Sequence, residues 1–224
     1  MSEHITLHAS DGQALGAYVA RPESDPIATL VVVQEIFGVN PSIRGVAGAY
    51  AREGFLAIAP AIFDRIERNF QCAYSPEEVA VARKFVANLD WTAMLRDSQA
   101  AIDAVKDVGP VGIIGFCLGG SVAYAAATKL SGLSAAIGYY GGAIVRFADD
   151  KPKVPTQLHF GEKDVGIPLG DVDIIRAKRP DVEIHTYPGA QHGFGCDERA
   201  SYDEASAGIA KRRSLDFFAT HLKR

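Results

Sequence analysis

The 224-residue chain contains no apolar run near the roughly 18 residues that a membrane-spanning helix requires. It has only three cysteines, Cys72, Cys117 and Cys196, and an odd number of distant cysteines does not predict a disulfide framework. Its 23 basic and 27 acidic residues are mixed along the sequence, and the net charge is −4. A nucleic-acid-binding protein is expected to show a basic excess or patch. We therefore expect neither a membrane nor a nucleic acid as a partner.

The N-terminal residues 1–4 lack the basic start and the apolar stretch of a signal peptide. Together with the expectation of reduced cysteines, this predicts a cytoplasmic protein. Hydrophobic residues make up 48% of the chain and charged residues 22%, close to the values of soluble globular proteins, so extensive disorder is not expected. A chain of this length fits one large core, and we predict a single α/β domain over residues 1–224.

Segments typical of strands and helices alternate along the chain. Strands are predicted at residues 3–9, 13–20, 28–34, 55–59, 111–115, 134–139, 155–160 and 182–187, and 28–34 is an apolar, β-branched run typical of a strand buried on both faces. Helices are predicted after Pro41 and Cys117 and over residues 75–89, 92–107, 171–178 and 200–221, the first of these ranges beginning with a Ser-Pro-Glu-Glu capping box. This alternation predicts an α/β fold with a mostly parallel sheet and helices on both faces. The irregular stretch 60–75 is expected to cross the top of the sheet.

The segment 111–120 has the pattern of a nucleophile elbow with cysteine in place of serine. An apolar strand leads into Gly115-Phe116-Cys117-Leu118-Gly119 and then into a helical sequence. The flanking glycines allow neighbouring elements to approach closely, and the helix N-terminus favours a thiolate and offers an oxyanion donor. An isolated cysteine at a tight turn is more often buried and inert. This combination of strand, glycines and helix instead indicates that Cys117 is a nucleophile.

The order nucleophile, acid, histidine in α/β-hydrolase chains identifies partners for Cys117. Asp164 follows the predicted strand at 155–160, and His192 lies in a glycine-rich loop after the strand at 182–187. Sites in open α/β sheets form at such carboxyl ends of strands. We predict that His192 is the base and later the acid, and that Asp164 orients it. The rival carboxylates and histidines lie in a predicted helix or in strands: Asp171, Asp173, His159 and His185.

With these motifs the chain resembles the dienelactone hydrolase family, over nearly all of the sequence from Val31 to the final helix. The resemblance rests on the segments 34–40 (Gln-Glu-Ile-Phe-Gly-Val-Asn), 115–120 (Gly-Phe-Cys-Leu-Gly-Gly), 139–141 (Tyr-Tyr-Gly), 161–168 and 189–194. It implies an eight-stranded α/β-hydrolase fold that uses neither a metal nor an organic cofactor.

The resemblance also implies roles for individual residues. Glu35 matches a glutamate beside the resting cysteine that helps to generate the thiolate when substrate binds; read without the family, it is a strand-end carboxylate or a solvated loop acid. Ile36 and Leu118 match the residues whose backbone N–H groups form the oxyanion hole. Arg65 matches one of two arginines that hold a substrate carboxylate, and Tyr140, in the Tyr-Tyr-Gly segment, is assigned to the substrate pocket.

The second arginine is where the sequence departs from the family pattern. Well-studied members have it four residues after the catalytic histidine, where this chain has Cys196. A small, nearly apolar side chain there predicts a wider and less polar substrate pocket, with Cys196 among its lining residues. Arg68 and Arg199 are the candidates to supply the missing charge from a loop.

The sequence thus predicts a hydrolase that cleaves a small lactone or carboxylic ester through a cysteine nucleophile and an acyl-thioester intermediate. One alternative keeps this machinery but acts on another small ester or thioester. A second is a zinc site formed by His192, Cys196 and Cys72, although no Cys-x-x-Cys pair supports it. A third is a non-catalytic binding module of the same fold. The small-molecule substrate is the only partner indicated, and the oligomeric state stays open.

Overall fold

The computed structural model of the chain describes residues 1–87 and 89–223. Within these residues, eight strands form one sheet in the order β1-β2-β4-β3-β5-β6-β7-β8. They are β1 (Ser2–His8), β2 (Ala14–Ala20), β3 (Ala28–Val33), β4 (Phe55–Pro60), β5 (Val111–Phe116), β6 (Leu133–Tyr139), β7 (Thr156–Gly161) and β8 (Glu183–Tyr187). The β1–β2 and β2–β4 pairs are antiparallel, and all pairs from β4 across to β8 are parallel. The predicted mostly parallel sheet is confirmed.

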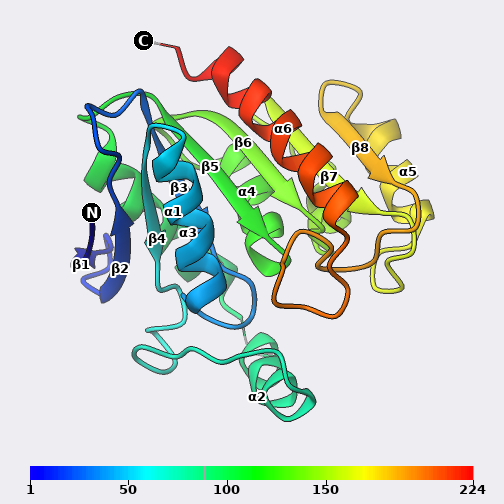
Figure 1. Cartoon of the computed structure of the whole chain (residues 1–224), viewed down its shortest axis with the longest axis horizontal. Helices are drawn as coiled ribbons and strands as arrows, with labels where there is room; N and C mark the ends of the chain where they lie inside the picture. The colour runs from blue at the N-terminus through cyan, green and yellow to red at the C-terminus, as the bar shows by residue number, and fades with distance from the viewer. Residues whose placement is uncertain (88, 224) are drawn as a thin grey trace.

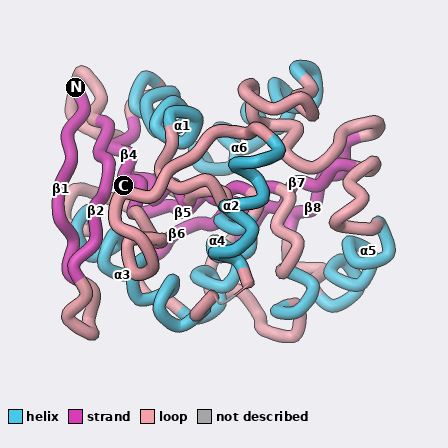
Figure 2. Tube along the Cα trace, turned by 90° about the horizontal axis from the view of Figure 1, so that it is seen from below, coloured by secondary structure: helices cyan, strands magenta, loops and turns pink. Residues whose placement is uncertain are grey.

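Helices cover both faces of this sheet, as predicted (Figure 1). They are α1 (Pro41–Arg52), α2 (Pro76–Val86), α3 (Trp91–Val105), α4 (Leu118–Lys129), α5 (Leu169–Lys178) and α6 (Glu204–His221), with a short 3-10 helix at Ile144–Phe147 that the sequence pattern does not predict. Helices α1 and α6 lie on one face, and α3 and α4 lie on the other (Figure 2). Helix α2 projects from the edge where the parallel strands end (Figure 1).

The central strands are apolar throughout because both of their faces are covered. Every residue of β3, β4 and β5 is buried, which explains a continuous apolar run in place of alternation. Leu30 and Val32 point into the core under α1 and α6, whereas Val31 and Val33 point into the core under α3 and α4. One strand therefore contributes to both cores, and the carboxyl ends of the parallel strands are fixed along one edge.

Local signals mark the helix starts much as predicted. The side chain of Asn40 caps α1 and that of Ser75 caps α2, each by accepting a hydrogen bond from a backbone N–H in the first turn. Helix α2 ends at Val86, before the predicted limit near residue 89, and Asn88 lies outside the described residues. Helix α6 begins four residues later than predicted because Asp203 is its capping residue.

The irregular segment 60–75 leads from β4 to α2, and aromatic contacts hold it in place. The ring of Phe70 lies 4.0 Å from that of Phe85 in α2 and 6.0 Å from that of Phe63, measured between centroids. Gln71 forms an isolated antiparallel bridge with Gly38, in the loop after β3. A Cβ atom on Gly38 would lie 2.0 Å from the Phe70 carbonyl oxygen, so only glycine permits this approach. The segment is thereby fixed beside the loop that follows β3.

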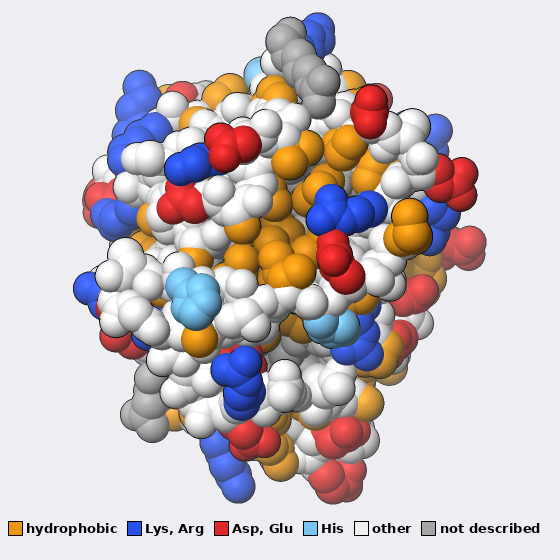
Figure 3. Space-filling model, turned by 90° about the vertical axis from the view of Figure 1, so that its left-hand side faces the viewer, with side chains coloured by type: hydrophobic (Ala, Val, Ile, Leu, Met, Phe, Trp, Pro, Cys, Tyr) orange, Lys and Arg blue, Asp and Glu red, His pale blue; other side chains and the backbone are white. Residues whose placement is uncertain are grey.

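The surface is of mixed charge on the side that Figure 3 presents. Acidic and basic side chains lie there around an apolar area (Figure 3). Surface ion pairs of the described residues include Arg21 with Glu3 at 2.7 Å. Among the described helices, none combines the length and the apolar character needed to cross a membrane.

Candidate active site

Cys117 stands at the turn between β5 and α4, in the backbone conformation of a nucleophile elbow. Its φ and ψ angles are 54° and −114°, a left-handed region that costs a non-glycine residue about 1–3 kcal/mol. A Cβ atom on Gly115 would lie 1.9 Å from the Gly119 carbonyl oxygen, and one on Gly119 would lie 2.3 Å from that of Val33. The two glycines that the sequence singled out thus allow α4 to pack directly on the sheet and hold the turn.

The structure brings the predicted nucleophile, base and acid together from three loops. His192 Nε2 lies 3.1 Å from Cys117 Sγ, and His192 Nδ1 lies 2.7 Å from Asp164 Oδ2. The second carboxylate oxygen of Asp164 accepts a 2.8 Å hydrogen bond from the Gly166 N–H. Asp164 is buried, so its carboxylate interacts mainly with the imidazole of His192. The rival residues lie elsewhere, with Asp171 in α5 and His159 in β7.

The surroundings of His192 favour its protonated form. Burial alone would lower the pKa of His192, but the hydrogen bonds to Asp164 and Cys117 and the charges of both raise this pKa to about 10. An imidazole of this kind readily keeps a proton that it takes from the thiol. The arrangement can therefore hold a thiolate beside an imidazolium.

Glu35 lies at the end of β3 and is 2% exposed, which excludes a solvated loop acid. Its Oε1 accepts a 2.8 Å hydrogen bond from Arg199 Nη1, and its Oε2 accepts one of 3.3 Å from the Tyr74 hydroxyl. Burial raises the pKa of Glu35, and the Arg199 guanidinium opposes that rise. The Arg199 guanidinium carbon lies 5.7 Å from the centroid of the Phe37 ring and 6.0 Å from that of Tyr74.

Ile36 and Leu118 are the residues whose backbone N–H groups the family resemblance assigns to an oxyanion hole. Leu118 is the first residue of α4, so its N–H is one of those that an α-helix leaves without an intrahelical acceptor. Ile36 follows Glu35 in the loop after β3. The described part of the chain provides no acceptor for either N–H. Their role as oxyanion donors stays a prediction.

Tyr140, directly after β6, combines backbone strain with an unsatisfied hydroxyl. Its φ angle is 37°, and its side chain is fully buried. Its ring lies edge-on to the ring of His192, with centroids 5.1 Å apart, and 5.5 Å from that of Phe194. Within the described residues, the Tyr140 hydroxyl has no hydrogen-bond partner. Such a group costs about 1–3 kcal/mol, so its presence beside the base requires an explanation.

The loop after β8 carries the base and closes on itself. The Ser201 hydroxyl donates a 2.6 Å hydrogen bond to the His192 carbonyl oxygen, and the Asp203 N–H donates one of 3.1 Å to the Phe194 carbonyl oxygen. These contacts fix both ends of the segment 195–200, which includes Arg199.

Comparison with known proteins identifies the family of this chain. The sequence profile of the dienelactone hydrolase family matches residues 15–222. The chain belongs to the dienelactone hydrolase family. Membership makes it a hydrolase of ester or lactone bonds, and the α/β-hydrolase fold that the resemblance implied is confirmed.

Similar proteins match along their whole length. The chain is 35% identical over 239 residues to a provisionally named carboxymethylenebutenolidase of Synechocystis, covering 98% of this chain and 96% of that one. It is 30% identical over 231 residues to the carboxymethylenebutenolidase of Pseudomonas putida, covering 98% and 97%. A solved structure from Klebsiella pneumoniae, provisionally named a dienelactone hydrolase, is 30% identical, has a TM-score of 0.86 and covers 98% and 99%.

Arg65, which the family resemblance assigned to a substrate carboxylate, has other partners in the structure. Its guanidinium makes hydrogen bonds of 2.7 and 2.8 Å to the buried Asp97 and of 3.0 and 3.1 Å to Asp11. Two carboxylates thus neutralise it, and it ties the β1–β2 turn and α3 to segment 60–75. This is a correction: the contacts of Arg65 support a structural ion pair and give no support to a carboxylate site.

Cys196 lies near Glu35, at the position where a wider pocket is expected. The cysteine is 5% exposed, and its Sγ lies 3.3 Å from the Ser42 hydroxyl oxygen. Burial and the nearby Glu35 carboxylate raise the pKa of this thiol. The Cys196 side chain is therefore packed against Ser42 and away from solvent, and a wider substrate pocket at this position stays a prediction.

Tyr74 and Arg199 are the contributors that sequence reasoning did not place. Arg199 was one of two candidates for the missing charge, and its pair with Glu35 now favours it over Arg68. Tyr74 precedes the α2 capping box within an irregular segment and offers no motif of its own. The proposed zinc ligands do not converge, since Cys72 Sγ contacts the Glu78 carbonyl oxygen at 3.9 Å while Cys196 contacts Ser42.

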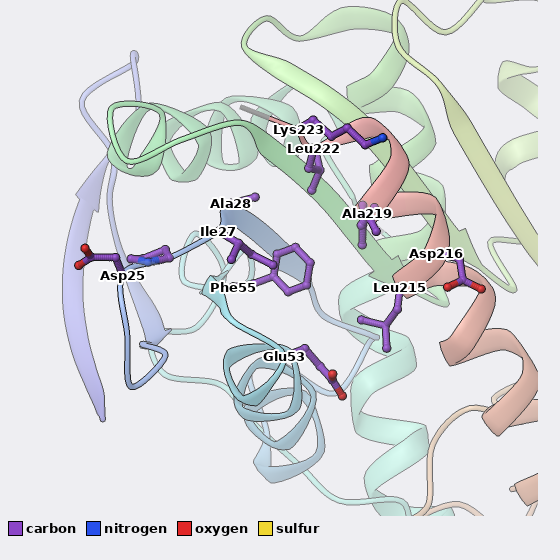
Figure 4. A pocket seen from close by; sticks show the side chains of 12 residues that line it. Asp25, Ile27, Ala28, Glu53, Phe55, Leu215, Asp216, Ala219, Leu222 and Lys223 are labelled. Atoms are coloured by element: carbon purple, nitrogen blue, oxygen red, sulfur yellow. The ribbon is translucent and has the colours of Figure 1, made fainter.

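A separate apolar cleft lies at the opposite ends of the strands. It encloses about 730 Å³ between the starts of β3 and β4 and the end of α6 (Figure 4). Ile27, Phe55, Leu215 and Leu222 contribute apolar side chains to it (Figure 4). None of the residues that line it belongs to the catalytic cluster described above.

Proposed function

We propose that the chain hydrolyses a small lactone or carboxylic ester by covalent catalysis, with Cys117 as the nucleophile. The observation that carries this proposal is the chain of contacts from Cys117 Sγ to His192 Nε2 and from His192 Nδ1 to Asp164, at a strained elbow. The domain is one α/β-hydrolase unit, and all eight described strands in a single sheet support this.

The reaction proceeds in two halves. His192 takes the thiol proton, and the sulfur attacks the acyl carbon, while the N–H groups of Ile36 and Leu118 stabilise the oxyanion. The C–O bond then breaks, His192 protonates the leaving oxygen, and an acyl-thioester remains on Cys117. In the second half His192 deprotonates a water, which attacks the thioester; the sulfur leaves and the free acid is released.

Glu35 and Arg199 adapt this machinery to an anionic substrate. In the free protein the guanidinium neutralises Glu35. A substrate carboxylate that pairs with Arg199 releases Glu35. The freed Glu35 side chain then assists formation of the thiolate. The charge needed for the substrate thus comes from Arg199 and not from position 196 or from Arg65.

The decisive experiment is removal of the thiol. Cys117→Ala should abolish nearly all turnover of unsaturated lactones and short-chain esters and keep the circular dichroism spectrum. Cys72→Ala is the matched control, since among the described residues its thiol has a backbone carbonyl as hydrogen-bond partner, and it should keep wild-type rates. Full activity in Cys117→Ala would refute the covalent mechanism.

Alkylation supplies a second test. Burial raises the pKa of Cys72 and of Cys196, so both should carry little thiolate at neutral pH. Iodoacetamide should therefore modify Cys117 first, at the rate at which activity is lost. A nucleophilic thiol must stay reduced, and the three unpaired cysteines of the described residues support a cytoplasmic location.

A further inference from the structure

Strand β1 leaves one edge of the sheet open. Among the described strands it pairs with β2 alone, and Figure 2 draws it as the outermost element on that side of the molecule. Its even-numbered residues, Ser2, His4, Thr6 and His8, are all exposed. The free edge of a strand carries unpaired backbone N–H and C=O groups, which can pair with a further strand. The outer edge of β1 is therefore a candidate interaction surface.

The hydrogen bonds at both ends of β1 identify the backbone groups that point outward. The N-terminal nitrogen of Met1 donates a 3.3 Å hydrogen bond to the Arg21 carbonyl oxygen, and the Arg21 N–H donates one of 2.8 Å to the Met1 carbonyl oxygen. The Ala9 N–H donates one of 2.9 Å to the Gln13 carbonyl oxygen. In an antiparallel pair, residues that bond to the partner strand alternate with residues that do not, and the register between these ends is unbroken. The odd-numbered residues therefore bond to β2, and the N–H and C=O groups of the even-numbered residues point outward.

The features that commonly keep a strand edge from pairing are missing from β1. Its pairing with β2 shows no shift of register, so no bulge twists it, and the segment Ser2–His8 contains neither proline nor lysine. Its one carboxylate, Glu3, is paired with Arg21. Strand β8, at the other edge of the sheet, is five residues long, begins with Glu183 and is followed directly by Pro188. Of the two edges of the described sheet, β1 is the one that is open to pairing.

A second copy of β1, running antiparallel across a two-fold axis, fits this edge. When the axis passes through the Ile5 position, each even-numbered residue faces an even-numbered residue of the other copy, so outward N–H groups meet outward C=O groups. His4 then lies opposite Thr6, and His8 lies opposite Ser2, so each imidazole meets a hydroxyl. A register centred on His4 or on Thr6 would instead place two imidazoles opposite each other. The pairing about Ile5 is therefore the complementary one.

We propose that β1 is a homodimer interface, through which two copies of the chain join their sheets into one continuous sheet about Ile5. Ile5 is half-buried and packs against the core under α3 and α4, and in the dimer it contacts its counterpart. Glu3 lies opposite Leu7 of the other copy, so like charges are not placed opposite each other. The pairing uses the same edge of both copies, so the assembly closes at two. The catalytic cluster described above contains no residue of β1, so this inference does not depend on the proposed function.

The first test measures the mass of the full chain by sedimentation equilibrium over a series of concentrations. Wild type should show twice the mass of one chain. Thr6→Pro removes an outward N–H and leaves the bonds to β2 in place. Because the symmetric dimer then loses two hydrogen bonds, its dissociation constant should rise at least about tenfold. Thr6→Val keeps the N–H and should dimerise as wild type does.

Three results would overturn the proposal. They are a wild-type monomer at every concentration, a mass above that of two chains, and equal dissociation constants for Thr6→Pro and Thr6→Val. Circular dichroism checks that both variants fold. If Thr6→Pro does not fold, Thr6→Lys takes its place, since it adds a charge to the exposed side of the edge and should weaken the dimer to a similar degree.

The second test examines the register by disulfide cross-linking. In Ile5→Cys the two new thiols face each other across the two-fold axis, so mild oxidation should give a covalent dimer on a non-reducing gel. His4→Cys and Thr6→Cys should cross-link at least about tenfold more slowly, because each of these positions lies opposite a different residue. Wild type, with its three unpaired cysteines, is the control. Faster cross-linking at position 4 or 6 than at position 5 would overturn the pairing about Ile5.

Discussion

Asp164 and Glu35 are two buried carboxylates on either side of the same cluster, but they are held in different ways. Asp164 accepts hydrogen bonds from Gly166, two residues away, and from His192, so its position is set by its own loop. Glu35 is held by Tyr74 and Arg199, 39 and 164 residues away in the sequence. Asp164 therefore keeps the same partners throughout the proposed reaction, whereas a bound anion can take the place of Glu35 at Arg199.

The largest effect is expected for substitution of Asp164, the carboxylate held by its own loop. Asp164→Asn should lower kcat for acid and ester substrates alike by at least about a hundredfold, because the amide no longer orients and stabilises the protonated imidazole. Steady-state kinetics on both substrates measure this. Asp171→Asn, in α5, is the control and should keep wild-type kinetics. Comparable losses in the two variants would show that the acid is misassigned.

Glu35→Gln tests the carboxylate whose arginine partner a bound anion can take, and it should have a smaller effect on kcat. The amide keeps the shape of Glu35 but has no charge with which to assist thiolate formation. We expect kcat to fall by roughly ten- to a hundredfold, at the lower end of the range for proton-transfer groups, with the circular dichroism spectrum retained. A rate equal to that of wild type would mean that Glu35 only packs against Arg199.

The two arginines sharpen the comparison further, because each pairs with a buried carboxylate. Arg199→Ala should lower kcat/KM for the carboxylate lactone about tenfold relative to its methyl ester. Arg65→Ala should change that ratio by less than about twofold, but it leaves Asp97 buried without its partner and should destabilise the fold by roughly 3 kcal/mol. Kinetics and urea unfolding of both variants check this. The reverse pattern would restore Arg65 as the anion ligand.

The last prediction concerns the pH dependence of stability and again addresses the His192–Asp164 pair. The pKa of His192 is raised from 6.5 to about 10 in the folded protein, so its contribution to stability is complete below about pH 6.5 and is lost as the pH rises through 10. The free energy of unfolding of wild type, relative to His192→Gln, should therefore decrease between pH 6.5 and 10. Urea titrations at several pH values measure the difference; a constant gap would contradict this reading of the pair.

Features with a local cause could be predicted from the sequence. The elbow at Cys117 depends on its flanking glycines and strand, and Asp164 and His192 each follow a strand that the alternating pattern of the chain predicts. Glu35, Ile36 and Leu118 were located through motif resemblance. The roles of these residues stay predictions.

The Arg199 side of the site could not be predicted in the same way. Tyr74 and Arg199 lie in irregular segments, and only tertiary packing decides which polar group each contacts. Arg65 shows the converse: its sequence position matches a family arginine, but Asp11 and Asp97 neutralise it in the folded chain. The expectation of a wider pocket at Cys196 has a related weakness. Residue size alone does not reveal whether a small side chain borders a cavity or is packed against its neighbours.

The closed loop after β8 has a consequence for how such an enzyme can diversify. Its two hydrogen bonds, from Ser201 to His192 and from Asp203 to Phe194, fasten the ends of the segment 195–200 to the scaffold. Substitutions within the segment 195–200 can alter the surroundings of Arg199 while the two hydrogen bonds keep the His192 imidazole in position. Substrate specificity can therefore change through substitutions at the six residues 195–200 while the catalytic residues keep their positions. A variant library confined to this segment is expected to alter specificity.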